Sequence, residues 1–196
     1  MLFNKSSILI LSFVISSLFW VRFSYAQTKS IKQIDSLYEV ARRTINVEQS
    51  NKLSHQMLID SKTINYTTGE INAGILLATN LHNEGKYSLA LERLHKIEPL
   101  ALSTENNAKI ANILALKANC YGRLKFFDKS NQLLNQAINY AKKIKENDRR
   151  YSNLGRIYRL LGSNITDDNS KPINKDSIFY YHKKSYEVQE KIEAKT

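Results

Sequence analysis

Apolar residues recur at intervals of three and four along almost the whole chain, which is typical of helices that bury one face. Polar clusters, glycines and prolines interrupt this pattern at spacings that would end helices. We therefore predict an all-α protein with eight helices in four consecutive antiparallel pairs. The predicted helices cover 31–41, 53–64, 67–83, 87–97, 104–124, 127–145, 154–162 and 178–192.

One pattern of large and small residues occurs twice, forty positions apart. Small residues at regular spacing let two helices cross closely, and such a pair can bury its apolar face only by stacking on the next pair. We therefore predict an α-solenoid of about four helix pairs, with a less regular first pair in 27–66 and three regular pairs in 67–196. The first copy comprises Leu77, Ala78, Leu81, Gly85, Tyr87, Ala90 and Leu94, and the second comprises Ala118, Tyr121, Phe127, Ser130, Leu134 and Ala137.

Local signals predict where some of these helices begin and end. Thr67 and Glu70 have the spacing of a capping box, in which Thr67 would begin the third helix. Gly85 suits the left-handed conformation that closes this helix. Pro99 is expected to end the fourth helix because proline has no amide donor.

The last helix pair departs from the regular spacing. In a regular pair, the residue of the second helix that crosses Gly155 would be at position 167. The apolar pattern instead places it at Ile178. This difference indicates an insertion of eleven residues. We expect a surface loop at 163–175, and either a functional role or a merely tolerated insertion is consistent with the sequence.

The final helix carries three further expectations. Asn174 or Asp176 would cap its first turn. The tract Phe179-Tyr180-Tyr181 is expected to form its buried face. Because no polar capping helix follows, self-association through the open last pair is one expectation for the partners of this chain.

The repeated pattern resembles the tetratricopeptide repeat (TPR), in particular that of exported bacterial proteins. Leu154-Gly155-x-x-Tyr158 matches the first-helix motif of the family, while Lys125 stands where the family has glycine. The spacings of 40 and 37 residues between successive small residues exceed the usual value of roughly 34. The resemblance covers 67–192. It implies a right-handed α-solenoid that binds a protein or peptide in its concave groove.

In this family, four positions of each first helix face the groove. Asparagine and arginine there can hold a peptide backbone or a carboxylate, because they supply amide and two-pronged guanidinium donors. Asn119 and Arg156 resemble part of the carboxylate clamp of chaperone-binding members, but Ile75, Thr79 and Ser152 replace its other residues, so no chaperone tail is expected. Ordinary solvated side chains are the alternative interpretation. The groove candidates are Asn72, Thr79, His82, Asn112, Asn119, Arg156 and Arg159. Arg149 and Ser152 lie on the same face.

Residues 1–26 have the layout of a secretory signal peptide. Lys5 precedes an uncharged run over 8–21, and small residues precede a cleavage site before Gln27. We expect a periplasmic or secreted protein. An uncleaved leader would instead anchor the chain in the inner membrane, and membrane contact is expected only through this segment.

The chain is basic, with a formal net charge of +11. Lys5 and Arg22 are the only charged residues of the leader, so +9 remains after cleavage. Such a balance is compatible with an acidic protein, an anionic membrane or nucleic acid. Export and the alternation of basic with acidic residues argue against nucleic acid as the partner.

No catalytic chemistry is predicted. The sequence contains no metal-binding helix motif, phosphate loop, nucleophile elbow or dinucleotide fingerprint, so neither a metal nor another cofactor is expected. Cys120 is expected to be a buried packing residue. The sequence therefore predicts a non-enzymatic, exported module that binds a protein or peptide. The alternative is the N-terminal sensor part of a membrane-anchored bacterial signalling or transcriptional regulator whose output domain is absent from this chain.

Overall fold

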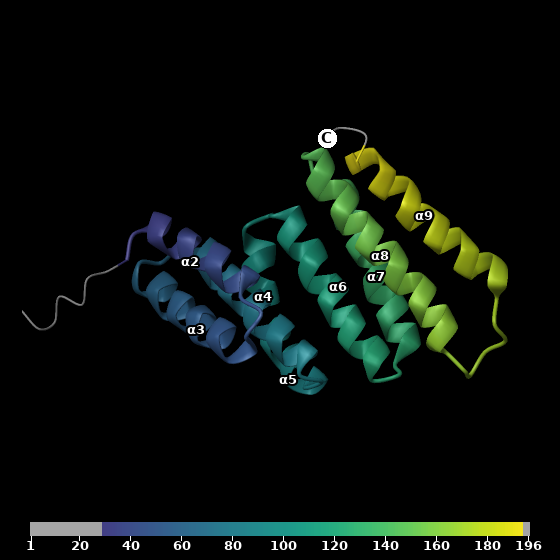
Figure 1. The fold of residues 1–196 in the computed structure, drawn as a ribbon, viewed down its shortest axis with the longest axis horizontal. Coiled ribbons are helices and arrows are strands. Elements are labelled where there is room, and N and C mark those ends of the chain that lie inside the picture. The colour runs from purple at the N-terminus through teal and green to yellow at the C-terminus, as the bar shows by residue number, and fades with distance from the viewer. Residues whose placement is uncertain (1–28, 194–196) are drawn as a thin grey trace, which may run out of the picture.

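The computed structural model describes residues 29–193, which contain eight α-helices and, within that range, no β-strand. Each helix packs against the next, and the pairs follow one another along the long axis of the molecule (Figure 1). The predicted all-α solenoid is confirmed. Its helices are α2 (Ile31–Arg43), α3 (Val47–Thr63), α4 (Thr67–Asn83), α5 (Tyr87–Ser103), α6 (Asn107–Arg123), α7 (Phe127–Lys142), α8 (Asn147–Asp167) and α9 (Lys175–Glu193).

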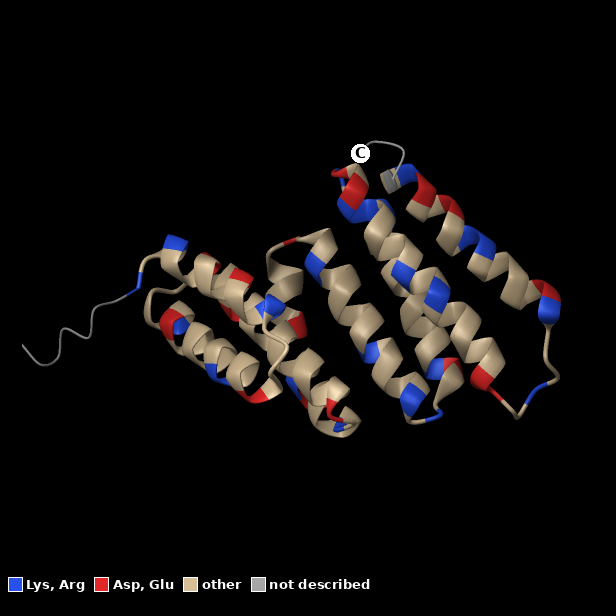
Figure 2. Cartoon of the chain, viewed as in Figure 1, with Lys and Arg blue, Asp and Glu red and all other residues tan. Residues whose placement is uncertain are grey.

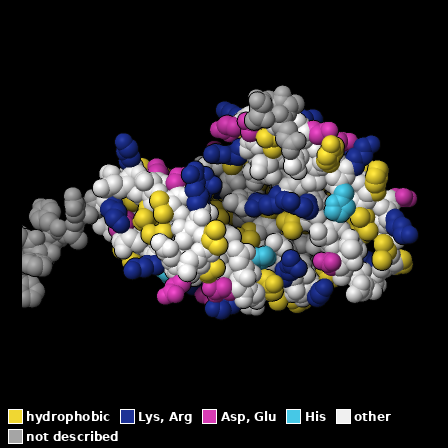
Figure 3. All heavy atoms as spheres, viewed as in Figure 1, with side chains coloured by type: hydrophobic (Ala, Val, Ile, Leu, Met, Phe, Trp, Pro, Cys, Tyr) yellow, Lys and Arg dark blue, Asp and Glu magenta, His cyan; other side chains and the backbone are white. Residues whose placement is uncertain are grey.

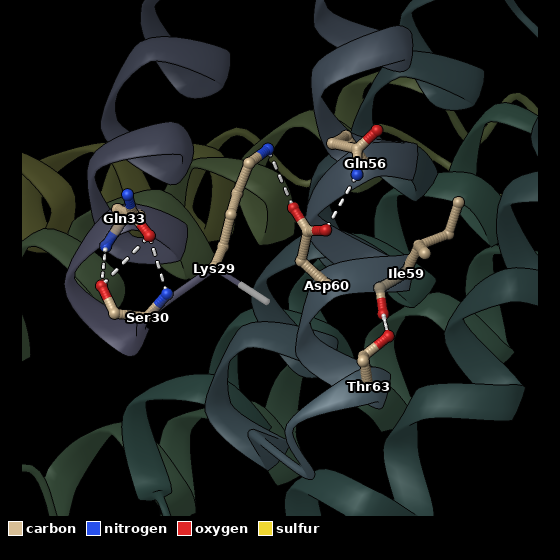
Figure 4. A network of polar contacts seen from close by, with 7 residues as sticks. All are labelled: Lys29, Ser30, Gln33, Gln56, Ile59, Asp60 and Thr63. Carbon is tan, nitrogen blue, oxygen red and sulfur yellow. Dashed lines mark hydrogen bonds and ion pairs between the residues drawn. The ribbon is translucent and has the colours of Figure 1, made fainter. Parts of the chain in front are cut away.

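A polar network attaches the beginning of the described chain to the first helix pair (Figure 4). Lys29 Nζ lies 3.0 Å from Asp60 Oδ2 on α3. Ser30 caps α2 and forms a capping box with Gln33. The predicted signal peptide, 1–26, lies outside the described residues. Among the helices of 29–193, none has both the length and the apolar character needed to cross a membrane.

The apolar core runs through the stack in two clusters. The smaller one joins Ile34 and Ala41 of α2, Met57 of α3 and Ala73 of α4. The larger one extends from Ile71 on α4 to Val188 on α9 and includes residues of every helix between them. Each pair therefore buries its apolar face against its neighbours, as expected for a solenoid.

Small residues bring the two helices of each pair close together. In α4 and α5, Ala78 and Ala90 are completely buried. In the other three pairs, a serine on the second helix donates a hydrogen bond to a main-chain carbonyl of the first, which requires the backbones to lie close to each other. These bonds run from Ser50 to Ala41 (3.1 Å), from Ser130 to Ala118 (2.7 Å) and from Ser185 to Gly155 (2.9 Å).

Two buried asparagines repeat one hydrogen-bond pattern between successive pairs. In each case, the side-chain amide on a first helix donates to a serine hydroxyl and to an asparagine carbonyl of the preceding helix. A buried polar group without partners costs about 1–3 kcal/mol, so the pattern holds the two helices in one register. The bonds run from Asn80 to Ser50 (3.0 Å) and Asn51 (2.9 Å), and from Asn164 to Ser130 (2.8 Å) and Asn131 (2.7 Å).

The spacing predicted for the last pair is wrong. Ser185, not Ile178, opposes Gly155, and the two are thirty residues apart, whereas Ala118 and Ser130 are twelve apart. The residue of α9 that contacts Gly155 therefore lies seven positions later than the sequence count placed it. The sequence count assumed first helices of equal length, whereas the last one is longer.

The loop predicted at 163–175 is shorter in the structure. α8 continues to Asp167, α9 begins at Lys175, and the connection covers only 168–174. The polar residues after position 162 remain helical because Asn164 is buried and hydrogen-bonded to α7. A polar sequence was taken for a loop because its tertiary partners cannot be seen in the sequence.

Predictions of helix ends were partly correct. Gly85 has a φ of 76°, and Asn174 Oδ1 accepts a hydrogen bond from a main-chain amide of α9 at 2.9 Å, so both are confirmed. Thr67 lies inside α4, whose N-cap is one residue earlier and has no side-chain cap, so the predicted capping box is wrong. Pro99 does not end α5. The helix continues past the proline because Ala101 beyond it is completely buried.

The prediction for the aromatic tract of the last helix is largely wrong. Phe179 is 69% exposed and Tyr180 is 52% exposed. Tyr181 is half-buried and stacks on Tyr158, with 6.5 Å between the ring centroids. Three consecutive residues of a helix cannot all lie on one face. Val188, which is buried, joins the apolar core together with the half-buried Tyr181.

We predict that Asn164→Ala destabilises the protein by about 1–3 kcal/mol, because it leaves buried partners on α7 without their donor. Asn80→Ala should have a similar effect. The two changes should be additive within about 0.5 kcal/mol, since the networks share no partner. Urea denaturation followed by circular dichroism measures both. Asn169→Ala, in the exposed connection after α8, is the control. An effect of Asn164→Ala no larger than the control would contradict the structural role of this network.

Candidate functional site

The first helices of the four pairs form one continuous face, called here the first-helix face. α2 packs on α4, α4 on α6, and α6 on α8. A hollow of about 360 Å³ opens on this face. Side chains from α2, α6 and α8 line it: Tyr38, Ala108, Lys109, Asn112, Arg149, Ser152, Asn153, Arg156 and Arg159.

The register of α8 explains why its arginines still face the hollow. Asn80 lies two residues after Ala78, and Asn164 lies two residues after Gly162. Because both asparagines bond to the preceding helix in the same way, Gly162 occupies the place in the stack that the sequence pattern assigned to Gly155. The error of seven residues is nearly two full turns of an α-helix, so the predicted face is unchanged.

The hollow is strongly basic. Four cations line it, namely Lys109 and three arginines of α8, and no carboxylate is among its lining residues. Basic side chains lie across the middle of this face, over α6 and α8 (Figure 3), and the acidic residues of α8 are at its ends (Figure 2). Like charges gathered on a recessed surface produce a positive potential that attracts anions.

Arg156 is the most unusual of these cations. Its side chain is partly buried, and within residues 29–193 its guanidinium forms no hydrogen bond or ion pair with another residue. Burial lowers the pKa of Arg156, and the neighbouring charge of Arg159 lowers it further. A guanidinium offers five donors in a planar fork, so this one is available to an anion entering the hollow.

Lys109 is held in position by the protein itself. Its ammonium donates a hydrogen bond to Asn72 Oδ1 and lies 5.4 Å from the centroid of the Tyr38 ring. Burial and then the charge of Arg149 lower the pKa of Lys109, while Asp35 raises it. Asp35 in turn accepts a hydrogen bond from a tyrosine of the α3–α4 connection at 2.9 Å. Lys109 is thus a pre-positioned cation that is only weakly neutralised.

The structure gathers three of the seven predicted groove residues, Asn112, Arg156 and Arg159, together with Arg149 and Ser152 of the same face. The other four do not line the hollow. Asn72 is buried beneath it as the acceptor for Lys109, Thr79 donates to a carbonyl of its own helix at 2.8 Å, His82 packs edge-on against a tyrosine ring, and Asn119 is half-buried farther along α6.

The sequence pattern did not predict Tyr38, Lys109 or Asn153 as residues of the hollow. Lys109 lies one turn before Asn112 on the same side of α6, so helical periodicity alone could have identified it. Tyr38 had no comparable signal, because α2 belongs to the least regular pair and no repeat position could be assigned to it.

A second hollow of about 280 Å³ adjoins the first, between α8 and α9. The two hollows share Ser152, Arg156 and Arg159. The additional lining residues of the second hollow are Tyr151, Gly155, Ser185, Gln189 and Ile192.

Neither hollow has a His, Cys, Asp or Glu among its lining residues. In the described part of the chain, no three His, Cys, Asp or Glu side chains come together in a way that could hold a metal ion. Cys120 is buried on α6, and burial raises the pKa of its thiol to about 11, which disfavours the reactive thiolate. The arrangement is suited to non-covalent recognition of anionic and hydrogen-bonding groups.

We predict that Arg156→Met raises the stability of the unliganded protein by about 1 kcal/mol, because an unpaired, partly buried charge is replaced by an apolar chain of similar length. Such a change corresponds to a rise in Tm of roughly 2–4 °C for a chain of this size. Differential scanning calorimetry measures it. Arg42→Met is the matched control, since Arg42 is ion-paired with Glu39 at 2.6 Å and should show no gain. A lower Tm for Arg156→Met would mean that this guanidinium stabilises the fold.

No protein-family model matches the sequence, and no curated protein matches it. Among solved structures, the apo form of RapI aligns with a TM-score of 0.67 and 19% identity, over 92% of this chain and 65% of RapI. This chain thus spans less than two thirds of RapI. A Podospora anserina kinesin light chain protein with nearly identical TPR-like repeats aligns with a TM-score of 0.55 and 14% identity, over 90% of this chain and 84% of that protein. These likenesses concern the fold, and they confirm the resemblance seen in the sequence: the chain has the fold of a TPR-like helical repeat protein.

Proposed function

We propose that this chain is an interaction module that binds an extended segment of a partner protein in the hollow of its first-helix face and in the adjoining hollow between α8 and α9. The TPR-like fold is in general suited to protein–protein interaction. The observation that carries the proposal is the hollow of about 360 Å³ to which α2, α6 and α8 all contribute. A site shared by three helices of a stack is positioned by the core and not by mobile loops.

The side chains of the hollow are those that recognise a peptide. Asn112 and Asn153 can donate to and accept from main-chain amide groups, and arginines can hold side-chain or main-chain oxygens with two parallel bonds. Both hollows have volumes near the lower range of about 300–1,000 Å³ that is typical of ligand sites. They would hold a few side chains of a segment whose remainder stays in solvent.

The groove can be tested with a random peptide library displayed on phage and selected on the immobilised full-length protein. We expect the protein to enrich binding sequences, and the double variant Asn112→Ala/Arg159→Ala to lose at least ten-fold in affinity for them. The control Arg43→Ala/Asn169→Ala removes the same two residue types from exposed positions outside the hollows and should bind as the unmodified protein does. Failure to enrich any peptide, or equal binding by the groove variant, would refute the proposal.

We further propose that the module acts after export to the periplasm. The support is the N-terminal layout of Lys5, the uncharged run over 8–21 and small residues before Gln27. Fractionation of the native cells and mass spectrometry of the intact protein test this directly. We expect a soluble periplasmic form that begins at Gln27. A membrane-bound form that retains Met1 would contradict cleavage and favour the anchored sensor, whereas a cytoplasmic form would contradict export.

A further inference from the structure

The two hollows form one path along α8. Ser152, Arg156 and Arg159 belong to the linings of both, so an occupant that crosses this row enters both hollows. A shared row of lining residues along α8 favours an extended occupant over a compact small molecule. The two ends of the path differ in chemistry, and this difference defines the occupant.

The first hollow requires negative charge. Its four cations form no ion pair with any acid in the described residues, and the pKa values of Lys109 and Arg156 are lowered by burial and by neighbouring arginines. A single carboxylate would leave most of this charge without a counter-charge. Two carboxylates could be held at once, because each arginine can bind one in a bidentate manner and Lys109 has donors beyond the one used by Asn72.

The second hollow has an apolar wall. Tyr151 and Ile192 lie on it, and Gly155 forms part of its floor. A Cβ at position 155 would lie 3.2 Å from Val188 Cγ2, closer than most such contacts, so glycine keeps the floor open while α9 stays packed. A modest apolar side chain fits this space, and its burial there would be favourable.

We infer that the bound segment is an acidic peptide in which at least two side-chain carboxylates occupy the basic hollow and an adjoining apolar side chain occupies the hollow between α8 and α9. This inference rests on the proposed function and specifies the class of segment that the groove selects.

Nucleic acid fits this path less well. A polyphosphate backbone requires a basic stripe that continues beyond one site, whereas the second hollow adds the apolar side chains of Tyr151 and Ile192 to the shared arginines, and the nearby Lys191 ammonium lies over the Tyr151 ring. Outside the hollows, several basic side chains form ion pairs with acids. Examples are Arg42 with Glu39 and Lys184 with Glu187. The four cations of the first hollow thus present positive charge where a short acidic segment can reach it.

The peptides enriched from the phage library test the inference. We expect most of them to carry two or more Asp or Glu residues next to Leu, Ile, Val or Phe. A synthetic copy of the best one should bind at least ten-fold more weakly when its acidic residues are replaced by Asn or Gln, and about three-fold or more weakly when its apolar residue is replaced by Ser. Affinity should fall as NaCl rises from about 0.05 M to about 0.5 M, since screening weakens charge pairing. Fluorescence anisotropy measures all three.

The protein variant Arg156→Gln separates charge recognition from general packing. It should weaken binding of the acidic peptide at least ten-fold but leave binding of the Asn/Gln peptide unchanged, and Arg42→Gln should change neither. Enriched peptides that are neutral or basic, yet still depend on Asn112 and Arg159, would overturn the inference and leave the proposed function standing. No enriched peptide at all would overturn both. A DNA duplex that displaces the acidic peptide at equal or lower concentration would also overturn the inference.

Discussion

Close contact between paired helices at small residues is the constraint on which the rest of the structure depends. Ala78 and Ala90 are completely buried, and at the last pair the Ser185 hydroxyl reaches the Gly155 carbonyl at 2.9 Å. Larger side chains at these positions would separate the helices and lose the dispersion contacts of a close-packed interior. The crossings also determine which side of each first helix remains free. The first-helix face and its hollows therefore follow from the same contacts that hold the pairs together.

Polar contacts fix how neighbouring helices are aligned along their axes. The asparagines that join α3 to α4 and α7 to α8 must find specific partners in a buried setting, so a slip by one residue would leave them unsatisfied. At the corresponding positions between α5 and α6 the chain has Ala90, Leu91 and Cys120, all buried. This middle seam is joined instead by an ion pair between Lys117 of α6 and Glu98 of α5, at 2.6 Å. The α8 helix, which contributes most of the basic hollow, is fixed by one of the asparagine seams.

The hollow contrasts with these asparagine seams. Asn80 and Asn164 are buried with hydrogen-bond partners, whereas Arg156 is partly buried without a partner among the described residues, and Lys109 is weakly neutralised. Desolvation and mutual repulsion make such an arrangement unfavourable for folding, and sites that work against stability are often the functional ones. An acidic ligand would remove both penalties at once, because it supplies the counter-charge that the protein lacks there.

The sequence by itself determined the helical class, the paired repeat and the side of α8 that faces the groove, because these depend on local periodicity and on single residues such as Gly85. The resemblance to the TPR pattern also singled out Asn112, Arg156 and Arg159, because it assigns them to groove-facing positions of the first helices. Only the tertiary structure decided how far α8 and α5 extend, since buried contacts beyond the expected ends keep those segments helical. Only the tertiary structure placed the Tyr38 ring next to Lys109 and Asn72 beneath the hollow as the hydrogen-bond acceptor of Lys109. These placements depend on contacts between helices far apart in sequence, about which local periodicity carries no information.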